Sequence, residues 1–260
     1  MSHERVVVLS MMIANGLALG LMERLLHRRS HRTLGEGAPH LRANLALTGL
    51  LIALNFAFDR IVATAGIAPR GDAFGLFRGW PLPEWARVVV VVVVLDGLAY
   101  VAHLLMHQAA PAWRFHRVHH SDPHVDVTTA FRQHPLETVW RYSFLLAGAL
   151  LLGASSVSVA VYLALSALMA QLEHAHVVLP PRLDRSVRLL FSSPAMHRVH
   201  HSRRQPETDT NYSNIFSFWD RLFGTYRPPR DGESIACGLD DLDDPEHQRT
   251  AGLLALPFGS

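Results

Sequence analysis

Apolar residues in this chain are gathered into long runs separated by polar segments. Residues 6–22 and 43–58 carry no charge, and residues 88–106 open with seven consecutive valines and contain one acid, Asp96. A helix needs about 20 apolar residues to cross a membrane. A buried helix of a soluble protein would explain any one of these runs. The three runs together predict membrane-spanning helices.

A fourth apolar run, residues 142–172, is uncharged and is broken in the middle by "GASS" at residues 153–156. The run is long for one span and short for two full spans. We therefore expect a shallow hairpin that dips into the bilayer and returns both ends to one side. The predicted fold class is all-α, a polytopic membrane helix bundle of about three spans plus this shallow hairpin, capped by a histidine-rich cytoplasmic helical region. Residues 1–228 are predicted to form one membrane-embedded catalytic domain, and residues 229–260, with "DDLDDPE", a polar C-terminal tail.

The basic residues add a prediction of how the chain is oriented in the membrane. The chain has no lysine, and only Arg5 precedes the first run, whereas the first loop is flanked by Arg24, Arg28, Arg29, Arg32 and Arg42. This asymmetry favours a bacterial inner-membrane protein with its histidine-rich side in the cytoplasm, although the loop between the second and third runs also carries four arginines. The first run lacks a basic n-region and a small-residue cleavage site, so we expect no cleaved signal peptide. The arginines flank apolar runs without forming a basic stripe, which argues against a nucleic-acid partner.

The histidines are the candidate functional residues. The pentapeptide "HRVHH" occurs at residues 116–120 and again at residues 197–201. On a helix, positions i, i+3 and i+4 share a face, so each copy is predicted to present its three imidazoles together as a metal-binding claw. "HLLMH" and "QLEHAHV" add further pairs, and the candidate metal ligands are His103, His107, His116, His119, His120, His174, His176, His197, His200 and His201. Nine or ten imidazoles exceed one coordination sphere and suit two metal ions.

Two alternatives apply to the histidines. One is a solvated basic helix face, and the other is chance in a chain with 17 histidines. The exact repetition and the neighbouring pairs argue against both. His134, in "FRQHPLE", is a further candidate for a position near the site. The single cysteine, Cys237, excludes an internal disulfide and a thiolate-based metal site.

The third run also carries a polar stripe. Asp96, Tyr100, His103 and His107 are spaced i, i+4, i+7 and i+11, which places them on one helix face. An ionisable residue within a membrane helix is costly unless it has a partner, so Asp96 is predicted to accept a hydrogen bond from a histidine N–H. Asp96 and Tyr100 are the candidate catalytic residues. The alternative is that Asp96 merely ends the buried part of the helix.

These motifs together resemble a known family. "HRVHHSDPHVDVTTAFRQHPLE" and "SSPAMHRVHHSRRQPETDTNYSNIFSFWDRLFGTY" are similar to bacterial members of the fatty acid hydroxylase and sterol desaturase superfamily, over about residues 96–226. The resemblance implies a non-haem dinuclear centre, normally of two iron ions, that uses O2 and two electrons to hydroxylate or desaturate a lipid C–H bond. Carried over residue by residue, it implies all the candidate ligands named above except His176.

Two positions depart from the family pattern. His176 stands where many relatives have Asn, so it is an extra ligand, a replacement for an Asn hydrogen bond, or neither. Ser213 stands where Gly is usual, which affects a turn more than the chemistry.

The expected function follows from the resemblance and the apolar runs. We expect a lipid substrate that enters from the bilayer, such as a fatty acyl chain, a sterol or a related lipid, and we favour hydroxylation over desaturation because it requires less control of the chain's position. The chain has no haem-binding or flavin-binding motif, so a separate electron-donor protein is expected. Acidic groups such as Asp96 and Asp220 are expected to offset the charge of the metals. The alternative is a non-catalytic membrane protein that binds metal for zinc storage, sensing or structural closure, since neutral histidines do not by themselves select iron over zinc.

Overall fold

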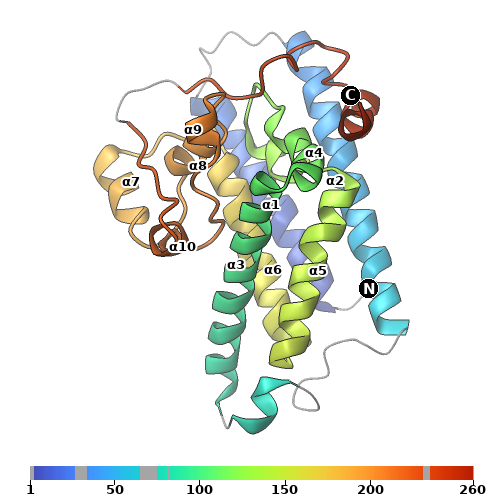
Figure 1. Cartoon of the computed structure of the whole chain (residues 1–260), viewed down its shortest axis with the longest axis vertical. Coiled ribbons are helices and arrows are strands. Elements are labelled where there is room, and N and C mark those ends of the chain that lie inside the picture. Colours follow the sequence, from blue (N-terminus) through green and yellow to red (C-terminus); the bar gives the residue numbers. More distant parts are fainter. Residues whose placement is uncertain (1–2, 27–33, 65–74, 81, 231–234, 260) are drawn as a thin grey trace.

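The computed structural model of the chain describes residues 3–26, 34–64, 75–80, 82–230 and 235–259. These residues are almost entirely helical, and they contain two isolated β-bridges and no strand. The longer helices, α1, α2, α3, α5 and α6, form an elongated bundle, and the shorter ones gather at one end of it and along its side (Figure 1). The helices are α1 (His3–Leu26), α2 (Leu34–Thr64), α3 (Glu84–Gln108), α4 (Ala110–His120), α5 (Pro135–Leu152), α6 (Ser156–His174), α7 (Pro181–Val187), α8 (Pro194–His200), α9 (Gln205–Thr208), α10 (Phe218–Leu222) and α11 (Thr250–Ala255), with short 3-10 helices η2 (Leu76–Gly79), η3 (Val127–Phe131) and η4 (Leu256–Phe258).

Four of these helices, α1, α2, α3 and α6, are long and apolar enough to cross a membrane. Helices α1, α2 and α3 each contain one of the first three predicted runs, and α6 contains the second part of the fourth. Large apolar side chains on their outer faces, such as Leu17 and Leu21 of α1, are exposed, as expected for helices that face lipid. The structure confirms the predicted all-helical, polytopic membrane class.

The predicted break in the fourth run is also confirmed. Helix α5 ends at Leu152 and α6 begins at Ser156. Gly153 has a φ of 69°, a left-handed conformation that favours glycine and ends α5. Ser155 accepts a hydrogen bond from the backbone N–H of Ser158 and so caps α6.

The α5–α6 hairpin reaches deeper than the expected shallow dip. Its turn lies beside the start of α3, where the hydroxyl of Ser155 donates to Glu84 Oε1 over 3.1 Å. Helix α5 lies close against α3 because Gly148 has no side chain, and a Cβ there would come within 2.8 Å of Leu95 Cδ2. The hairpin therefore follows α3 along much of its length and contributes the fourth candidate span, α6.

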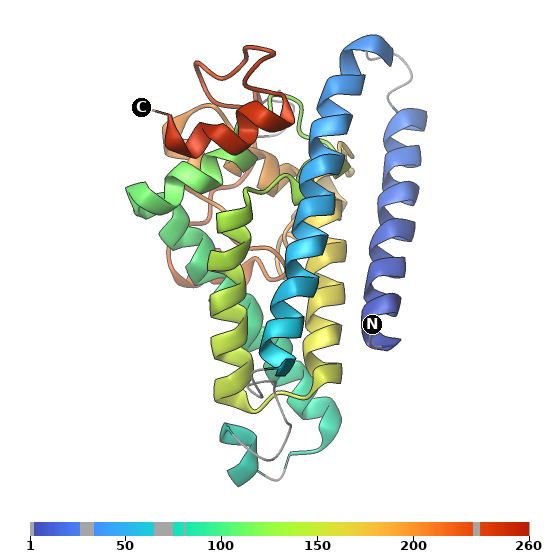
Figure 2. The ribbon, with the colours of Figure 1, turned by 90° about the vertical axis from the view of Figure 1, so that its right-hand side faces the viewer.

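The interior of the bundle lies between α3, α5 and α6. Val91, Val92 and Leu95 of the valine-rich helix are buried there, against Ala149 and Leu152 of α5. In Figure 2, α2 lies at the front, where it packs against α5, and α1 lies at the right-hand edge, where it packs against α6. Arg28, Arg29 and Arg32, on which the predicted orientation partly depends, lie outside the described residues.

The C-terminal segment, for which we predicted only a polar tail, packs on the bundle where the described residues cover it. Leu253 of α11 is fully buried against Ala43, Leu47 and Val118. Burial of this apolar side chain holds the segment in place in spite of its acidic composition. The division of the chain at residue 228 stays a prediction.

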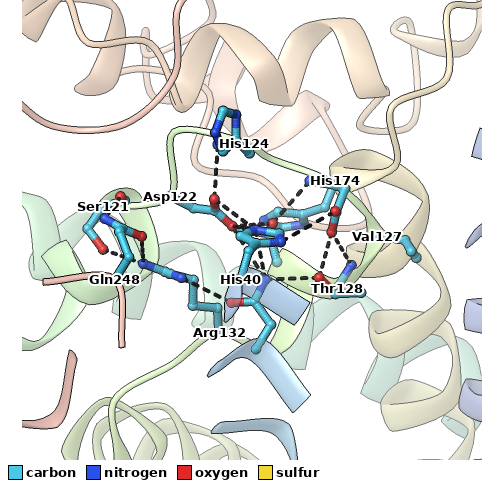
Figure 3. Close-up of polar contacts among 12 residues, drawn as sticks. His40, Ser121, Asp122, His124, Val127, Thr128, Arg132, His174 and Gln248 are labelled. Atoms are coloured by element: carbon cyan, nitrogen blue, oxygen red, sulfur yellow. Dashed lines mark hydrogen bonds and ion pairs between the residues drawn. The ribbon is translucent and has the colours of Figure 1, made fainter. Parts of the chain in front are cut away.

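A buried polar network ties the same segment to the end of α4. The guanidinium of Arg132 donates to Ser121 Oγ and to Gln248 Oε1, at 2.9 and 2.7 Å (Figure 3). Asp122 contacts His40 and accepts from the backbone N–H of His124 in the same view. Burial opposes ionisation of Asp122, but Arg132 and His40 prevail and hold the pKa of this carboxyl well below its usual range. The network fixes the chain immediately after the first "HRVHH".

Candidate metal centre

Nine histidines converge in two adjacent groups at the end of the bundle where α3 finishes. The ligand nitrogens within each group lie within 4.8 Å of one another, and all but one of the nine residues are buried. We call the larger set the five-histidine group and the smaller set the four-histidine group. The five-histidine group contains His103, His107, His116, His120 and His200, and the four-histidine group contains His119, His174, His197 and His201.

The two groups divide the "HRVHH" repeats in a way that the sequence did not predict. The first repeat gives its outer pair, His116 and His120, to the five-histidine group and His119 to the other. The second repeat does the reverse, since only His200 joins the five-histidine group. The prediction that each repeat acts as one three-imidazole claw is therefore wrong. The middle histidine of each repeat lies nearer to the other repeat than to its own. The ring centroid of His119 lies 4.7 Å from that of His201, and the ring centroid of His200 lies 4.6 Å from that of His120.

The nitrogens within each group are spaced as ligands of one ion would be. In the four-histidine group, Nε2 of His174 lies 3.0 Å from Nε2 of His197 and 3.1 Å from that of His119. In the five-histidine group, Nε2 of His116 lies 3.0 Å from that of His103. Two nitrogens about 2.0–2.1 Å from the same metal are about 2.9 Å apart at right angles and about 3.4 Å apart in a tetrahedron. The spacing therefore fits a bound ion.

Hydrogen bonds on the other ring nitrogen set the tautomer of several rings. Nδ1 of His103 lies 2.7 Å from the carbonyl of Tyr212, Nδ1 of His174 lies 2.6 Å from that of Ala170, and Nδ1 of His200 lies 2.8 Å from that of Thr210. A carbonyl only accepts, so in each neutral ring the proton is on Nδ1 and Nε2 presents a lone pair. Facing lone pairs repel one another unless a cation lies between them. The donor set therefore fits a metal.

Unpaired nitrogens support the same interpretation. Nε2 of His107 and Nε2 of His200 are both buried and have no hydrogen-bond partner in the described part of the chain. A buried polar atom without a partner is costly. A metal ion in the five-histidine group would give both nitrogens a ligand role.

Burial also keeps the imidazoles outside the spans neutral. It lowers the pKa of His119 well below its usual range, and neighbouring imidazoles add to the effect. The same combination lowers the pKa of His201. Burial lowers the pKa of His200 to about 3, against the opposing hydrogen bond from Nδ1 to Thr210. Neutral imidazole is the form that binds metal.

Two buried glutamates lie behind the groups, and our sequence analysis missed both. Oε1 of Glu137 lies 3.0 Å from Nδ1 of His116 in the five-histidine group. Oε2 of Glu173 lies 3.8 Å from Nδ1 of His197 in the four-histidine group. The available signal was charge at the edge of apolar sequence, since Glu173 directly follows the uncharged run and Glu137 precedes it by five residues. The argument that an ionisable residue within apolar sequence needs a partner, made above for Asp96, applies equally to both glutamates.

Asp96 has different partners from those we predicted. Its carboxylate accepts from the backbone N–H groups of Ile215 and Phe216, each at 3.1 Å, and from Trp219 Nε1 at 3.0 Å. None of these partners is a histidine, because the segment before α10 folds over this level of α3. Asp96 therefore anchors that segment to α3, and its predicted role as a histidine acceptor is corrected.

Tyr100 and Asp220 reach the site only through intermediates. The hydroxyls of Tyr100 and Thr225 lie 2.8 Å apart. Asp220 accepts from Thr225 Oγ1 and from the backbone N–H of Tyr212, whose carbonyl accepts from His103. Asp220 thus positions the loop that orients His103.

The structure does not bring His176 or His134 into either group. The backbone N–H of His176 donates to Glu23 Oε1 of α1 over 2.6 Å. His134 caps α5 by accepting from Leu136 N, and its ring packs on Phe115. Among the three alternatives for His176, the geometry favours a position outside the ligand set.

Comparison with known proteins agrees with this geometry. Residues 88–225 match the model of the family described as fatty acid hydroxylase. The chain is 34% identical over 161 residues to the ornithine lipid hydroxylase OlsE of Rhizobium tropici, covering 62% of this chain and 47% of that protein. It is 29% identical over 211 residues to the alkylglycerol monooxygenase of Homo sapiens, covering 78% of this chain and 45% of that protein. It is 25% identical over 157 residues to methylsterol monooxygenase 2-2 of Arabidopsis thaliana, covering 59% of this chain and 58% of that protein.

The chain spans about half the length of the first two of these relatives. No solved structure matches it. The family match covers more than half of the chain and includes all nine histidines of the two groups. This chain is a membrane protein whose two histidine groups fit a metal centre, and it belongs to the fatty acid hydroxylase family.

Proposed function

We propose that this chain is an O2-dependent oxygenase that hydroxylates a C–H bond of a membrane lipid. The observation that carries the proposal is the position of two adjacent, buried histidine groups at the end of apolar helices. In this proposal a lipid tail reaches this end from the bilayer without entering water. The similar proteins are named as hydroxylases or monooxygenases of three different lipids, which supports the reaction more than any one substrate.

The proposed cofactors are two iron ions, one in each histidine group. When bound, they would supply the O2 activation and two-electron chemistry that an unreactive methylene requires. The chain's own residues hold the ligand nitrogens in place, exclude water through burial, and place the buried carboxyl groups of Glu137 and Glu173 behind the ligand rings. Neutral imidazoles also bind zinc, so the purified protein can carry zinc in place of iron.

The proposed location is the bacterial inner membrane, with the metal centre on the cytoplasmic side, where a separate electron-donor protein delivers electrons. Cys237 is unsuited to test this because its side chain is buried. A cysteine introduced by Arg204→Cys, at an exposed position of the histidine-rich end, is the better reporter in a Cys237→Ser background. An impermeant thiol reagent should label it only after the cells are opened. Labelling in intact cells would contradict the cytoplasmic side.

The test of the function compares lipids from cells that express the intact chain with those from cells that express His119→Ala. Under labelled dioxygen, the intact chain should yield a lipid with one labelled oxygen atom, and the variant should not. An alkene without label would indicate desaturation. Two zinc ions per chain with no oxidised lipid, when an electron donor is supplied, would favour the non-catalytic metal-binding alternative.

A further inference from the structure

Helices α7 and α10 project from one side of the bundle (Figure 1), and several large apolar side chains of this region are exposed outside the histidine groups. We call residues 181–191 and 215–223 the α7–α10 platform. Leu189 is 70% exposed and Leu222 66% exposed, and the large apolar side chains exposed on the platform are Leu183, Leu189, Leu190, Phe191, Leu222 and Phe223. So many neighbouring apolar side chains indicate an interaction surface.

The platform is a single hydrogen-bonded unit. The backbone N–H of Ser217 donates to the carbonyl of Leu190 over 3.0 Å, and Phe191 and Phe216 form an antiparallel bridge. Arg221 donates through a guanidinium nitrogen to the carbonyl of Arg188 over 2.6 Å. Two segments distant in sequence are therefore held in a fixed relation, and the exposed patch is a built surface.

The platform is attached to α3 at a defined level. Asp96 binds its backbone, as described above, and the ring of Phe223 stacks on that of Tyr100 with 5.3 Å between centroids. A helix rises about 1.5 Å per residue, so Asp96 and Tyr100 lie about 18 and 24 Å along α3 from Glu84. The hydrocarbon core of a bilayer is about 30 Å thick.

Two exposed tryptophans indicate that the far boundary of that core lies at the start of α3. Trp80 and Trp85 are exposed there, and tryptophan is enriched at membrane interfaces. With the boundary at Glu84, the hydrocarbon region extends past Tyr100 toward the metal-binding end of α3. The level at which the platform joins α3 then falls inside the leaflet nearer to the metal centre.

We propose that the apolar face of the α7–α10 platform is embedded in this leaflet, in contact with the acyl chains just below the headgroups. The occupant of the patch is therefore lipid, and the surface continues the lipid-facing side of α3. Arg182 and Arg185 are exposed on the same platform, which suits the phosphate level of a membrane interface. The loop that precedes α10 also carries Tyr212, whose carbonyl binds His103, so the embedded platform connects the membrane surface with the metal ligands.

The test measures membrane depth. Leu222→Cys and Leu190→Cys, each in the full chain with Cys237→Ser, are labelled with a small fluorophore and reconstituted into phosphatidylcholine vesicles whose acyl chains are brominated near the headgroup. Arg204→Cys, at the exposed residue that directly precedes α9 at the histidine-rich end, is the matched control. Both platform positions should lose fluorescence in the brominated lipid relative to ordinary lipid, and the control should not.

Quenching at the platform positions no stronger than at the control would overturn the proposal, as would full access of iodide from water. Either result is expected if the patch instead contacts a second copy of the chain or a soluble protein. Circular dichroism and a normal elution volume in detergent show that each variant is folded. The measurement requires neither metal nor turnover, so its failure is distinguishable from failure of the proposed oxygenase function.

Discussion

Nδ1 of His116 lies 3.0 Å from Oε1 of Glu137, and both side chains are buried. The residues belong to different helices, α4 and α5, and their contact lies directly behind the five-histidine group. A carboxyl group in this position accepts from Nδ1–H, holds the imidazole with Nε2 toward the five-histidine group, and makes it a stronger ligand.

Glu137→Gln should therefore weaken metal binding by about 10- to 100-fold, the usual effect of losing such a partner. Competition with a chromogenic chelator measures the affinity. Glu246→Gln, at an exposed position paired with Arg249, is the matched control and should leave the affinity unchanged. Equal affinity in both variants would show that Glu137 does not support the ligand.

The division of the repeats predicts different effects for their two middle histidines. His119→Ala leaves three histidines in its group, whereas His200→Ala leaves four in the other. Metal analysis by mass spectrometry should give about two ions for the intact chain. We expect His119→Ala to lose the ion of the four-histidine group more completely than His200→Ala loses the other. His176→Ala should retain both ions, and metal loss there would restore this residue as a ligand.

Asp96→Asn should reduce stability, because the carboxylate accepts three hydrogen bonds from the segment before α10 and from Trp219. The side chain of Asn has an NH2 donor where Asp has an acceptor oxygen, so this NH2 group would face the existing N–H donors. Hydrogen bonds to a charged group contribute about 1.5–3 kcal/mol each. The melting temperature in detergent should fall, while the number of bound metals stays the same. Asp240→Asn, at an exposed site, controls for the loss of charge. Metal loss without a fall in melting temperature would support the original prediction of a direct role at the histidines.

The lowered pKa of His200 predicts a loss of stability in acid. This group has a pKa of about 3 in the folded protein and about 6.5 when unfolded. Between these values the unfolded state binds the additional proton, so the free energy of unfolding falls as the pH drops below about 6.5. The metal-free protein should melt at a lower temperature at pH 5 than at pH 7. His247→Gln, at an exposed position, should keep this profile, and a flat profile in the intact chain would contradict the prediction.

Leu253→Ala tests whether the C-terminal segment is part of the fold. The side chain is fully buried against α2 and α4, and removal of a buried leucine costs about 2–5 kcal/mol. Val178→Ala, at a position 80% exposed, should have little effect. Thermal unfolding in detergent compares the two variants, and equal melting temperatures would show that the segment contributes nothing to stability.

The sequence by itself determined the membrane-spanning runs, the break between α5 and α6, and the nine histidines of the two groups. These features depend on local rules. Apolar length decides which segments can cross a bilayer, Gly153 ends a helix through its left-handed conformation, and the spacing of His116 and His120 places both on one helical face.

Tertiary packing alone decided which histidines share a group. Helical spacing fixes a face but not the distance to a second helix, so the exchange of His119 and His200 between the groups depends on how α4 and α8 approach each other. Tertiary packing also decided which groups pair with the buried charges. Asp96 binds a segment about 120 residues away, and Glu137 takes the place behind a histidine that we predicted for Asp96. A buried charge requires a partner, and only the folded chain determines which groups come near enough to provide it.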